Sequence, residues 1–280
     1  MESALVTLRN ESIFVMQMGE GEPIVFLHGG PGGEHRFFLP HLEPLSSQFK
    51  LVFYDQRGCG RSSFCEEAVY TMEEEVETLE ALRKHLDIGR LNLVGESWGS
   101  MLALLYASKY PANINRLFLT AAVGAKTEGY KNFGRLLMER LSEEEQERFH
   151  QVIEDYKKGK AAAADIFQII DPYYLNDSAN LARKTETISN SMVNSQIGED
   201  ILQHYESGIS PAALAEIPVM AAQGVRDILT PDMLKELLLP LIPHAVIEVI
   251  PECGHWTAIE QPAILMEKII EFFSREKRND

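Results

Sequence analysis

Three side chains in the sequence have the types and the placement that nucleophilic catalysis needs. Ser97 stands between two glycines in Gly95-Glu-Ser-Trp-Gly99, while Asp227 and His255 each follow a predicted strand further along the chain. Serine is a weak nucleophile at neutral pH, so it needs a base to take its proton, and a carboxylate must hold that base in the useful tautomer. The three residues predict acyl transfer through Ser97, with His255 as the base and Asp227 as its partner.

The glycines around Ser97 indicate a sharp turn between two buried elements. An apolar, strand-like run at 91–94 precedes Gly95, and a helix-forming run begins two residues past the serine. This strand-turn-helix context is that of the Gly-x-Ser-x-Gly nucleophile elbow. The turn strains the serine backbone, and a larger residue in place of either glycine would collide with the neighbouring strand or helix. Taken singly, each of the three residues also fits an ordinary loop, but their order and their shared position after strands favour the catalytic interpretation.

A glycine-rich loop upstream is a candidate source of hydrogen-bond donors. His28-Gly-Gly-Pro-Gly-Gly33 follows an apolar run at 24–27. Because Pro31 has no N–H group, Gly30 is the best-placed donor for a developing negative charge. A plain tight turn is the alternative, and a phosphate-binding loop is excluded because no Gly-Lys-Ser/Thr follows.

A second polar loop, residues 55–62, follows the apolar run 51–54. Open parallel sheets place their sites at the carboxyl ends of strands, which is where this loop begins. We expect Asp55 and Arg57 to pair there and to hold the loop rigid, with a direct part in the chemistry as the alternative.

The elements that must position these loops alternate between strands and helices. Strands are expected at 4–8, 13–18, 24–27, 51–54, 91–94, 117–120, 218–222 and 246–250, the first two as a hairpin at one edge. Helices are expected from Thr71 to near Gly89 and at 100–110, 231–239 and 262–273, with capping-box spacing at Thr71 and Glu74. This alternation predicts an α/β fold with a mostly parallel central sheet and helices on both faces.

The alternation stops between residues 124 and 210. Helical patterns at 135–156, 161–170 and 181–188 replace it, Ser142 and Glu145 have capping-box spacing, and no strand pattern is convincing. We therefore expect a core made of residues 1–123 and 211–280, with a helical insertion at 124–210.

Composition and charge exclude several classes of function. A chain of 280 residues with 45% apolar content can bury one large core. A net charge of −16 argues against partners such as nucleic acid or an anionic membrane surface, both of which attract basic patches.

Cys59, Cys65 and Cys253 lack metal-ligand spacing and predict neither a zinc site nor a disulfide framework. They fit a reducing compartment. Residues 1–14 lack a signal-peptide pattern, and no apolar run reaches the length of a membrane span, so we expect a cytoplasmic protein.

Several motifs together resemble one known group. His28-Gly-Gly-Pro-Gly32, the Asp-Gln-Arg-Gly-Cys-Gly-Arg-Ser run at 55–62, Gly95-Glu-Ser-Trp-Gly-Ser100, Gly-x-x-Asp at 224–227 and Gly254-His255 look like the α/β-hydrolase group that contains the prolyl iminopeptidases. The resemblance covers about 190 residues of the predicted core, and the order Ser, Asp, His is that of the α/β-hydrolase fold. It implies a Ser97, His255 and Asp227 triad, an oxyanion hole formed by the backbone N–H groups of Gly30 and Trp98, and a helical cap over the pocket.

The resemblance is weaker where specificity is decided. Those peptidases hold the free α-amino group of the substrate with carboxylates, usually glutamates, from the cap or from beside the catalytic aspartate. Here Ile228 follows Asp227, and residues 190–197 contain no acid. Glu96 is an acid where a glycine is common in the group, and it either faces the substrate or points away from it. We expect substrate contacts from Gly29, Glu96 and Trp256.

These observations predict a serine hydrolase that needs no cofactor or metal. The first expectation is a proline iminopeptidase-like aminopeptidase that releases N-terminal residues from small peptides. A carboxylesterase or lactonase acting on small acyl esters is the alternative, because such enzymes need no amine anchor. A non-catalytic receptor with the same fold is a third possibility, which the complete triad disfavours. A dehalogenase is disfavoured because its chemistry needs a carboxylate at position 97.

Overall fold

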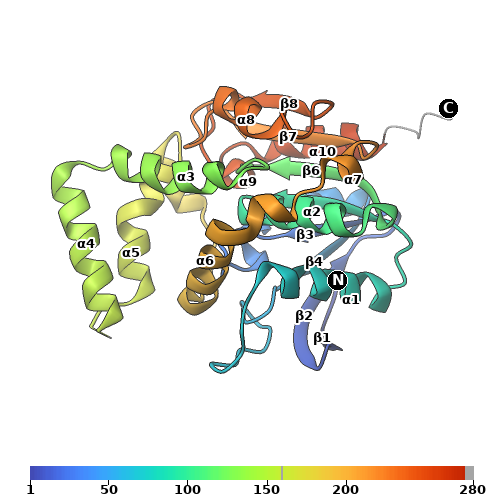
Figure 1. Ribbon diagram of the computed structural model, residues 1–280, viewed down its shortest axis with the longest axis horizontal. Helices are drawn as coiled ribbons and strands as arrows, with labels where there is room; N and C mark the ends of the chain where they lie inside the picture. Colours follow the sequence, from blue (N-terminus) through green and yellow to red (C-terminus); the bar gives the residue numbers. More distant parts are fainter. Residues whose placement is uncertain (159, 275–280) are drawn as a thin grey trace.

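The computed structural model describes residues 1–158 and 160–274. Within them, the strands form one eight-stranded sheet in the order β1-β2-β4-β3-β5-β6-β7-β8 (Figure 1). The strands are β1 (Glu2–Leu8), β2 (Glu11–Met18), β3 (Pro23–Leu27), β4 (Lys50–Tyr54), β5 (Leu91–Glu96), β6 (Ile114–Thr120), β7 (Val219–Gly224) and β8 (Val246–Ile250). The hairpin β1-β2 is antiparallel and lies at one edge, and every neighbouring pair from β4 to β8 is parallel, which confirms the predicted sheet.

The central strands are mostly apolar, in keeping with the helices that cover both of their faces. Side chains alternate across the sheet, so Val25 and Leu27 of β3 enter one core while Ile24 and Phe26 enter the other. The first core lies under α1 (Met72–His85), α2 (Trp98–Lys109) and α8 (Pro231–Leu238), and the second lies under α10 (Pro262–Ser274). Three of the four predicted core helices are confirmed to within two residues at each end, and α1 ends at His85, four residues before the expected end near Gly89. Two single-turn helices, α7 (Pro211–Leu214) and α9 (Thr257–Glu260), complete the core.

The capping box predicted at the start of α1 is half present. The Thr71 side chain accepts a hydrogen bond from the Glu74 amide, which satisfies one free N–H group of the first turn. The Glu74 side chain turns away and pairs with Arg9 on the β1-β2 hairpin, so it does not return to the cap. The long-range ion pair replaces the local contact.

The insertion between β6 and β7 is helical, as predicted, but two of its boundaries were wrong. It contains α3 (Thr127–Arg140), α4 (Glu143–Lys157), α5 (Ala163–Ile170) and α6 (Ser191–Gly208), and α4 and α5 project at the left of Figure 1. The helix expected at 135–156 is two helices, because Ser142 forms the predicted capping box with Glu145 and starts α4 there.

The helix expected at 181–188 is absent, and α6 follows it. The chain makes a 3-10 turn at Ser178–Arg183 and then runs without helical hydrogen bonds to Asn190. Its polar groups bind the core instead: Thr185 donates to the Leu39 carbonyl, and the Ile188 amide donates to the Glu34 carboxylate. The start of α6 is then capped by the Asn190 side chain. Tertiary contacts therefore outweigh the local helical pattern.

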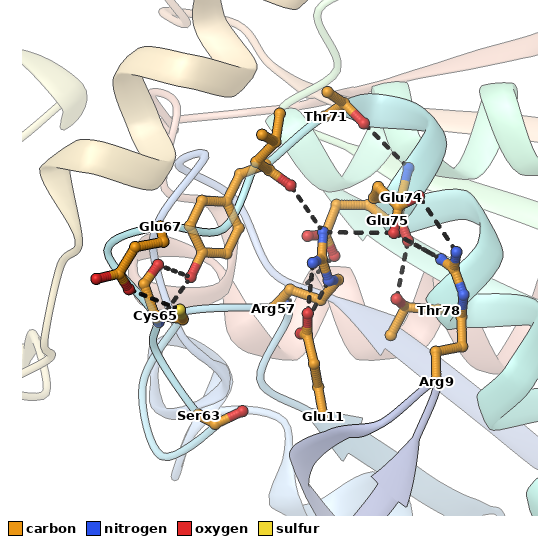
Figure 2. A network of polar contacts seen from close by, with 12 residues as sticks. Arg9, Glu11, Arg57, Ser63, Cys65, Glu67, Thr71, Glu74, Glu75 and Thr78 are labelled. Carbon is orange, nitrogen blue, oxygen red and sulfur yellow. Dashed lines mark hydrogen bonds and ion pairs between the residues drawn. The ribbon is translucent and has the colours of Figure 1, made fainter.

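The loop after β4 is held by ion pairs, but not by the predicted one. Figure 2 shows the Arg57 guanidinium directed at Glu11 of β2, with a 2.9 Å bond from Nε to the carboxylate. Asp55 instead accepts hydrogen bonds from His35 and from the Arg61 amide. The expected pairing of Asp55 with Arg57 was thus wrong, because each has a partner on a different neighbouring segment.

In the two stretches that the structure describes, no helix is both long and apolar enough to cross a membrane.

A buried carboxyl group on α1 makes stability depend on pH. Glu75 is fully buried, its Oε1 has no hydrogen-bond partner within the described residues, and its Oε2 accepts only a long bond from the Arg57 amide (3.4 Å). Burial raises the pKa of Glu75 from the usual 4.5 to about 8, against the opposing attraction of Arg57. Between pH 4.5 and 8 the folded protein therefore binds more protons than the unfolded chain, and the contribution of Glu75 to stability falls as the pH rises through this window.

We expect Glu75→Gln to remove this loss of stability. The melting temperature of the variant minus that of wild type should increase between pH 5 and pH 8.5. The increase should be roughly 4–8 °C if about 2 kcal/mol of burial cost is removed. Scanning calorimetry across this range measures the effect, with the exposed neighbour Glu73→Gln as the control. Parallel curves for Glu75→Gln and wild type would contradict the raised pKa.

Candidate active site

Ser97 occupies the sharp turn that the sequence predicts between β5 and α2. Its backbone has φ = 51° and ψ = −116°, a conformation that non-glycine residues rarely adopt. A Cβ on Gly95 would lie 2.3 Å from the Gly99 carbonyl oxygen, and one on Gly99 would lie 2.1 Å from that of Leu27. The strand and helix are thus packed as closely as backbone atoms allow. Ser97 is partly exposed, whereas its immediate neighbours are buried.

The three residues from distant parts of the chain meet in one hydrogen-bonded row. Ser97 Oγ lies 3.0 Å from Nε2 of His255, and Nδ1 of His255 lies 2.8 Å from Oδ1 of Asp227. They follow β5, β8 and β7 respectively, at the carboxyl edge of the parallel strands. This arrangement allows a proton to pass from the hydroxyl to the imidazole while a carboxylate balances the new charge.

The imidazole is tuned by the charges beside it. Burial lowers the pKa of His255, but the charge and hydrogen bond of Asp227, together with the charge of Glu96, outweigh burial, so that the pKa is raised above the usual 6.5. The positive form of the base is therefore favoured by its surroundings.

Gln223 holds the second oxygen of Asp227, which sequence reasoning missed. Its Nε2 donates to Asp227 Oδ2 and to the Leu229 carbonyl, both at 2.8 Å, while its Oε1 accepts from the Ala122 amide. The Leu229 amide donates to Asp227 Oδ1 at 3.2 Å. A glutamine in the otherwise apolar strand β7 was the available signal, because a buried polar side chain must find partners.

The two predicted oxyanion donors lie on backbone segments that flank Ser97. Trp98 is the first residue of α2, so its N–H group has no acceptor within the helix, and Gly30 lies in the loop after β3. Among the described residues, neither amide donates to a protein acceptor. Both groups are therefore available to a ligand.

Glu96 packs against the loop after β3, beside the candidate nucleophile. It is buried, and a Cβ on Gly29 would lie 2.1 Å from its Oε2, so the absence of a side chain at Gly29 makes room for the carboxyl group. Burial raises the pKa of Glu96 to about 7, and Asp227 adds to this effect, whereas His255 and the Gly29 amide oppose it. Glu96 therefore changes charge near neutral pH, next to the row of three residues.

Aromatic rings surround His255. The ring centres of Phe133 and Tyr174, both from the insertion, lie 4.6 and 5.5 Å from the imidazole. Trp256, a predicted substrate contact, stacks on Tyr174 at 5.1 Å, approaches Phe37 at 6.1 Å and is 8% exposed. It is mainly part of this aromatic cluster, with a small exposed surface.

The insertion is bonded to the loop that carries Asp227. Nη2 of Arg140, on α3, donates to the backbone carbonyls of Arg226 (3.0 Å) and Asp227 (2.7 Å). Its Nη1 donates to the Tyr173 carbonyl at 2.9 Å. One guanidinium thus connects the insertion to the backbone of the candidate catalytic aspartate.

A single carboxylate connects the insertion to the loop that carries His255. Glu260 is 5% exposed and accepts hydrogen bonds from the Gly254 amide at 2.6 Å and from the Asn176 and Asp177 amides at 3.0 Å. In addition, the His255 amide donates to the Tyr174 carbonyl at 2.7 Å. The insertion and the histidine loop therefore share their backbone hydrogen bonds.

The start of α6 is bonded to the glycine-rich loop after β3. The Asn190 amide donates to the Gly32 carbonyl, and the Asn194 side chain donates to the Pro31 carbonyl, both at 2.8 Å. Together with Arg140 and Glu260, these contacts attach the insertion to each loop that carries a predicted site residue, apart from the elbow itself.

One group of side chains has the spacing of a metal site but the bonding of a structural network. Ligand atoms of Glu34, His35 and Asp55 lie within 4.8 Å of one another. Asp55 Oδ1 accepts from both the amide and Nδ1 of His35, and Glu34 is paired with Arg36. Because these atoms are already engaged, the group fits a support that joins the two glycine-containing loops rather than an ion site.

Comparisons with known proteins agree with the fold. A family model described as the alpha/beta hydrolase fold matches residues 22–262. The proline iminopeptidase of Lactobacillus crispatus (strain ST1) is 28% identical over 274 residues, with 88% of each chain covered. An esterase from Thermogutta terrifontis superposes with a TM-score of 0.68 at 21% identity over 98% of both chains, and the proline iminopeptidase of Mycobacterium smegmatis with 0.68 at 20% identity over 97% of both.

We expect Glu260→Gln to loosen the insertion from the histidine loop. The substitution replaces one acceptor oxygen by an NH2 group that faces N–H donors, which should destabilise the protein by about 2 kcal/mol and lower the melting temperature by roughly 4–8 °C. Hydrogen exchange should become faster at the amides of residues 174–177 and 254–255. Glu267→Gln on the exposed face of α10 is the control, and unchanged exchange in Glu260→Gln would show that the carboxylate does not carry the contact.

Proposed function

The chain belongs to the alpha/beta hydrolase fold family, and from this premise we propose that it is a serine hydrolase working through an acyl-enzyme. The observation that carries the proposal is the continuous row Ser97 Oγ, His255 and Asp227, with separations of 3.0 and 2.8 Å. Both distances are short enough for proton transfer or for a strong hydrogen bond. Ser97 is the nucleophile, His255 the base and Asp227 the carboxylate that orients it.

The proposed reaction has two halves. His255 Nε2 takes the proton of Ser97 as Oγ bonds to the substrate carbonyl carbon, and the same imidazole then returns the proton to the departing amine or alcohol. Water enters next and gives a proton to His255 as its oxygen bonds to the acyl carbon. His255 then returns that proton to Ser97 Oγ as the bond between Oγ and the acyl carbon breaks, which releases the acid and restores the enzyme. In both halves the N–H groups of Gly30 and Trp98 stabilise the negative carbonyl oxygen.

The insertion, residues 124–210, acts in this proposal as a cap that completes the site over the core of residues 1–123 and 211–280. Phe133 and Tyr174 supply rings beside the imidazole, which suit a compact apolar acyl group such as proline. The rings and the backbone contacts of the cap leave a partly exposed Ser97, consistent with small substrates.

Within this class, a proline iminopeptidase-like aminopeptidase is the activity that we propose first. The similar Lactobacillus crispatus protein carries that name, and Glu96 supplies a carboxyl group beside Ser97 that receives no side-chain hydrogen bond from the described residues. The α-amino group of a peptide is positively charged near neutral pH, so an ionised Glu96 would hold it next to the scissile carbonyl. The lack of a side chain at Gly29 leaves room for this carboxyl group.

An esterase or lactonase is the second candidate, and one contact favours it. Asp171 is a buried acid of the cap, but Lys184 already pairs with it and also lies over the Trp256 ring at 5.0 Å. An amine would find this cap carboxylate already neutralised. Substrates without a free amine need no such group.

Ser97→Ala should reduce turnover to the residual level given by binding and the oxyanion hole, at least about 10³-fold below wild type. The measurement is hydrolysis of proline naphthylamide, short acyl esters and lactones, with fluorophosphonate labelling as a direct test of the nucleophile. Ser207→Ala, on the surface of α6, is the control. Retained labelling in Ser97→Ala would contradict the assignment, and a preference for esters with no need for a free amine would favour the second candidate.

Glu96→Gln should selectively impair substrates that carry a free amine. Because Glu96 ionises near pH 7, KM of the wild type for proline naphthylamide should fall as the pH rises from 6 to 7.5, while an N-acetylated analogue should not follow this trend. Loss of a charged contact should raise KM for the amine substrate about 10- to 100-fold and flatten its pH dependence. Asp171→Asn is the comparison variant. A raised KM for the amine substrate in Asp171→Asn, and not in Glu96→Gln, would mean that the amine binds at the cap carboxylate instead.

A further inference from the structure

Gln56 lies between the two backbone segments that carry the proposed oxyanion donors. It follows β4 and is 1% exposed, far in sequence from both His28 and Trp98. Its Nε2 donates to the His28 carbonyl at 2.9 Å, and its Oε1 accepts from the indole Nε1 of Trp98 at 2.8 Å. One amide side chain therefore bridges the start of the glycine-rich loop and the first residue of α2.

We propose that Gln56 is a positioning residue that sets the separation of the Gly30 and Trp98 N–H groups. The inference rests on the proposed serine hydrolase function. Among the described residues, Gln56 makes no hydrogen bond to Ser97, His255 or Asp227, so it acts on the oxyanion hole and not on the proton transfer.

The backbone of Gln56 strengthens the same connection through His28. The Gln56 amide donates to His28 Nε2 at 3.1 Å, and His28 Nδ1 lies 2.9 Å from the Gly29 carbonyl oxygen. We assign the proton to Nδ1 from this pattern, because Nε2 must accept while Nδ1 faces an acceptor. Burial also lowers the pKa of His28, in agreement with a neutral ring. The glycine-rich loop is thus fixed at His28 by both the side chain and the main chain of residue 56.

The two partners of Gln56 explain why its side chain is an amide. The His28 carbonyl needs a donor, and the Trp98 indole needs an acceptor. A glutamate offers no hydrogen, and a lysine offers no lone pair, so either would leave one buried group unpaired. Methionine matches the length of glutamine but makes neither bond.

A mere packing role and a positioning role predict different kinetics. Oxyanion donors act on charge that develops in the transition state, and small displacements of such groups are costly. Loss of the bridge should therefore lower kcat and leave KM nearly unchanged. The pH profile should also stay in place, because the base and its carboxylate are untouched. A packing defect would lower stability without this pattern.

The experiment compares Gln56→Met and Gln56→Glu with wild type. The substrate is the one that wild type hydrolyses best, and the second readout is binding of a boronic acid transition-state analogue. We expect kcat to fall about 10- to 100-fold and the affinity for the analogue to fall in parallel, with KM within about twofold. The pKa of the kcat/KM profile should be unchanged in Gln56→Met, which adds no ionisable group. Gln223→Met is the matched control: it removes a buried glutamine from Asp227, so it should shift the pH profile.

Trp98→Phe tests the same bridge from its other end and covers a failure of the Gln56 variants to fold. It removes the indole donor and keeps the backbone amide, so kcat and analogue affinity should again fall together. In the double variant Gln56→Met with Trp98→Phe, the losses should be less than additive because both substitutions remove the same hydrogen bond, that between the Trp98 indole and Gln56. Unchanged kcat in folded variants, or fully additive losses, would overturn the positioning role. Absence of any hydrolysis and of Ser97 labelling in wild type would instead refute the proposed function itself.

Discussion

The structure depends on a strained serine backbone between β5 and α2. A residue with φ near 50° and ψ near −116° costs on the order of 1–3 kcal/mol and persists only where its surroundings impose it. Here the Ser97 amide donates to the Thr120 carbonyl, and the Ser100 hydroxyl donates to the Ser97 carbonyl at 2.6 Å. The same turn orients the first amide of α2 beside the hydroxyl group. The proposed nucleophile and one proposed oxyanion donor are therefore placed by one backbone conformation.

Buried carboxyl groups serve different ends in this protein according to the donors around them. Asp227 accepts from His255, Gln223 and the Leu229 amide, which hold it in one orientation. Glu260 collects backbone amides from two segments and joins them. Glu96 has the Gly29 amide beside it, and burial raises its pKa to about 7, so its charge changes near neutral pH. The same chemical group is thus held in one orientation at Asp227, joins two backbone segments at Glu260, and titrates near neutral pH at Glu96.

Much of the fold and the central residues of the site could be predicted because they follow local rules. Ser97, Asp227 and His255 each stand after an apolar strand, and glycines mark the elbow, so short windows of sequence contain the information. The supporting residues could not be found in this way. Arg140 binds backbone carbonyls 86 and 87 residues away. The segment 184–190 is not helical and instead donates hydrogen bonds to Glu34 and Gly32. Such partners are set by the tertiary fold.

The sharing of hydrogen bonds between Glu260, the histidine loop and the 174–177 segment has a consequence for modular evolution. A recombination event that replaced the helical insertion by one of different backbone shape would leave Glu260 without its Asn176 and Asp177 partners and the His255 amide without its acceptor. Exchange of side chains on the existing insertion keeps these backbone bonds and avoids that cost.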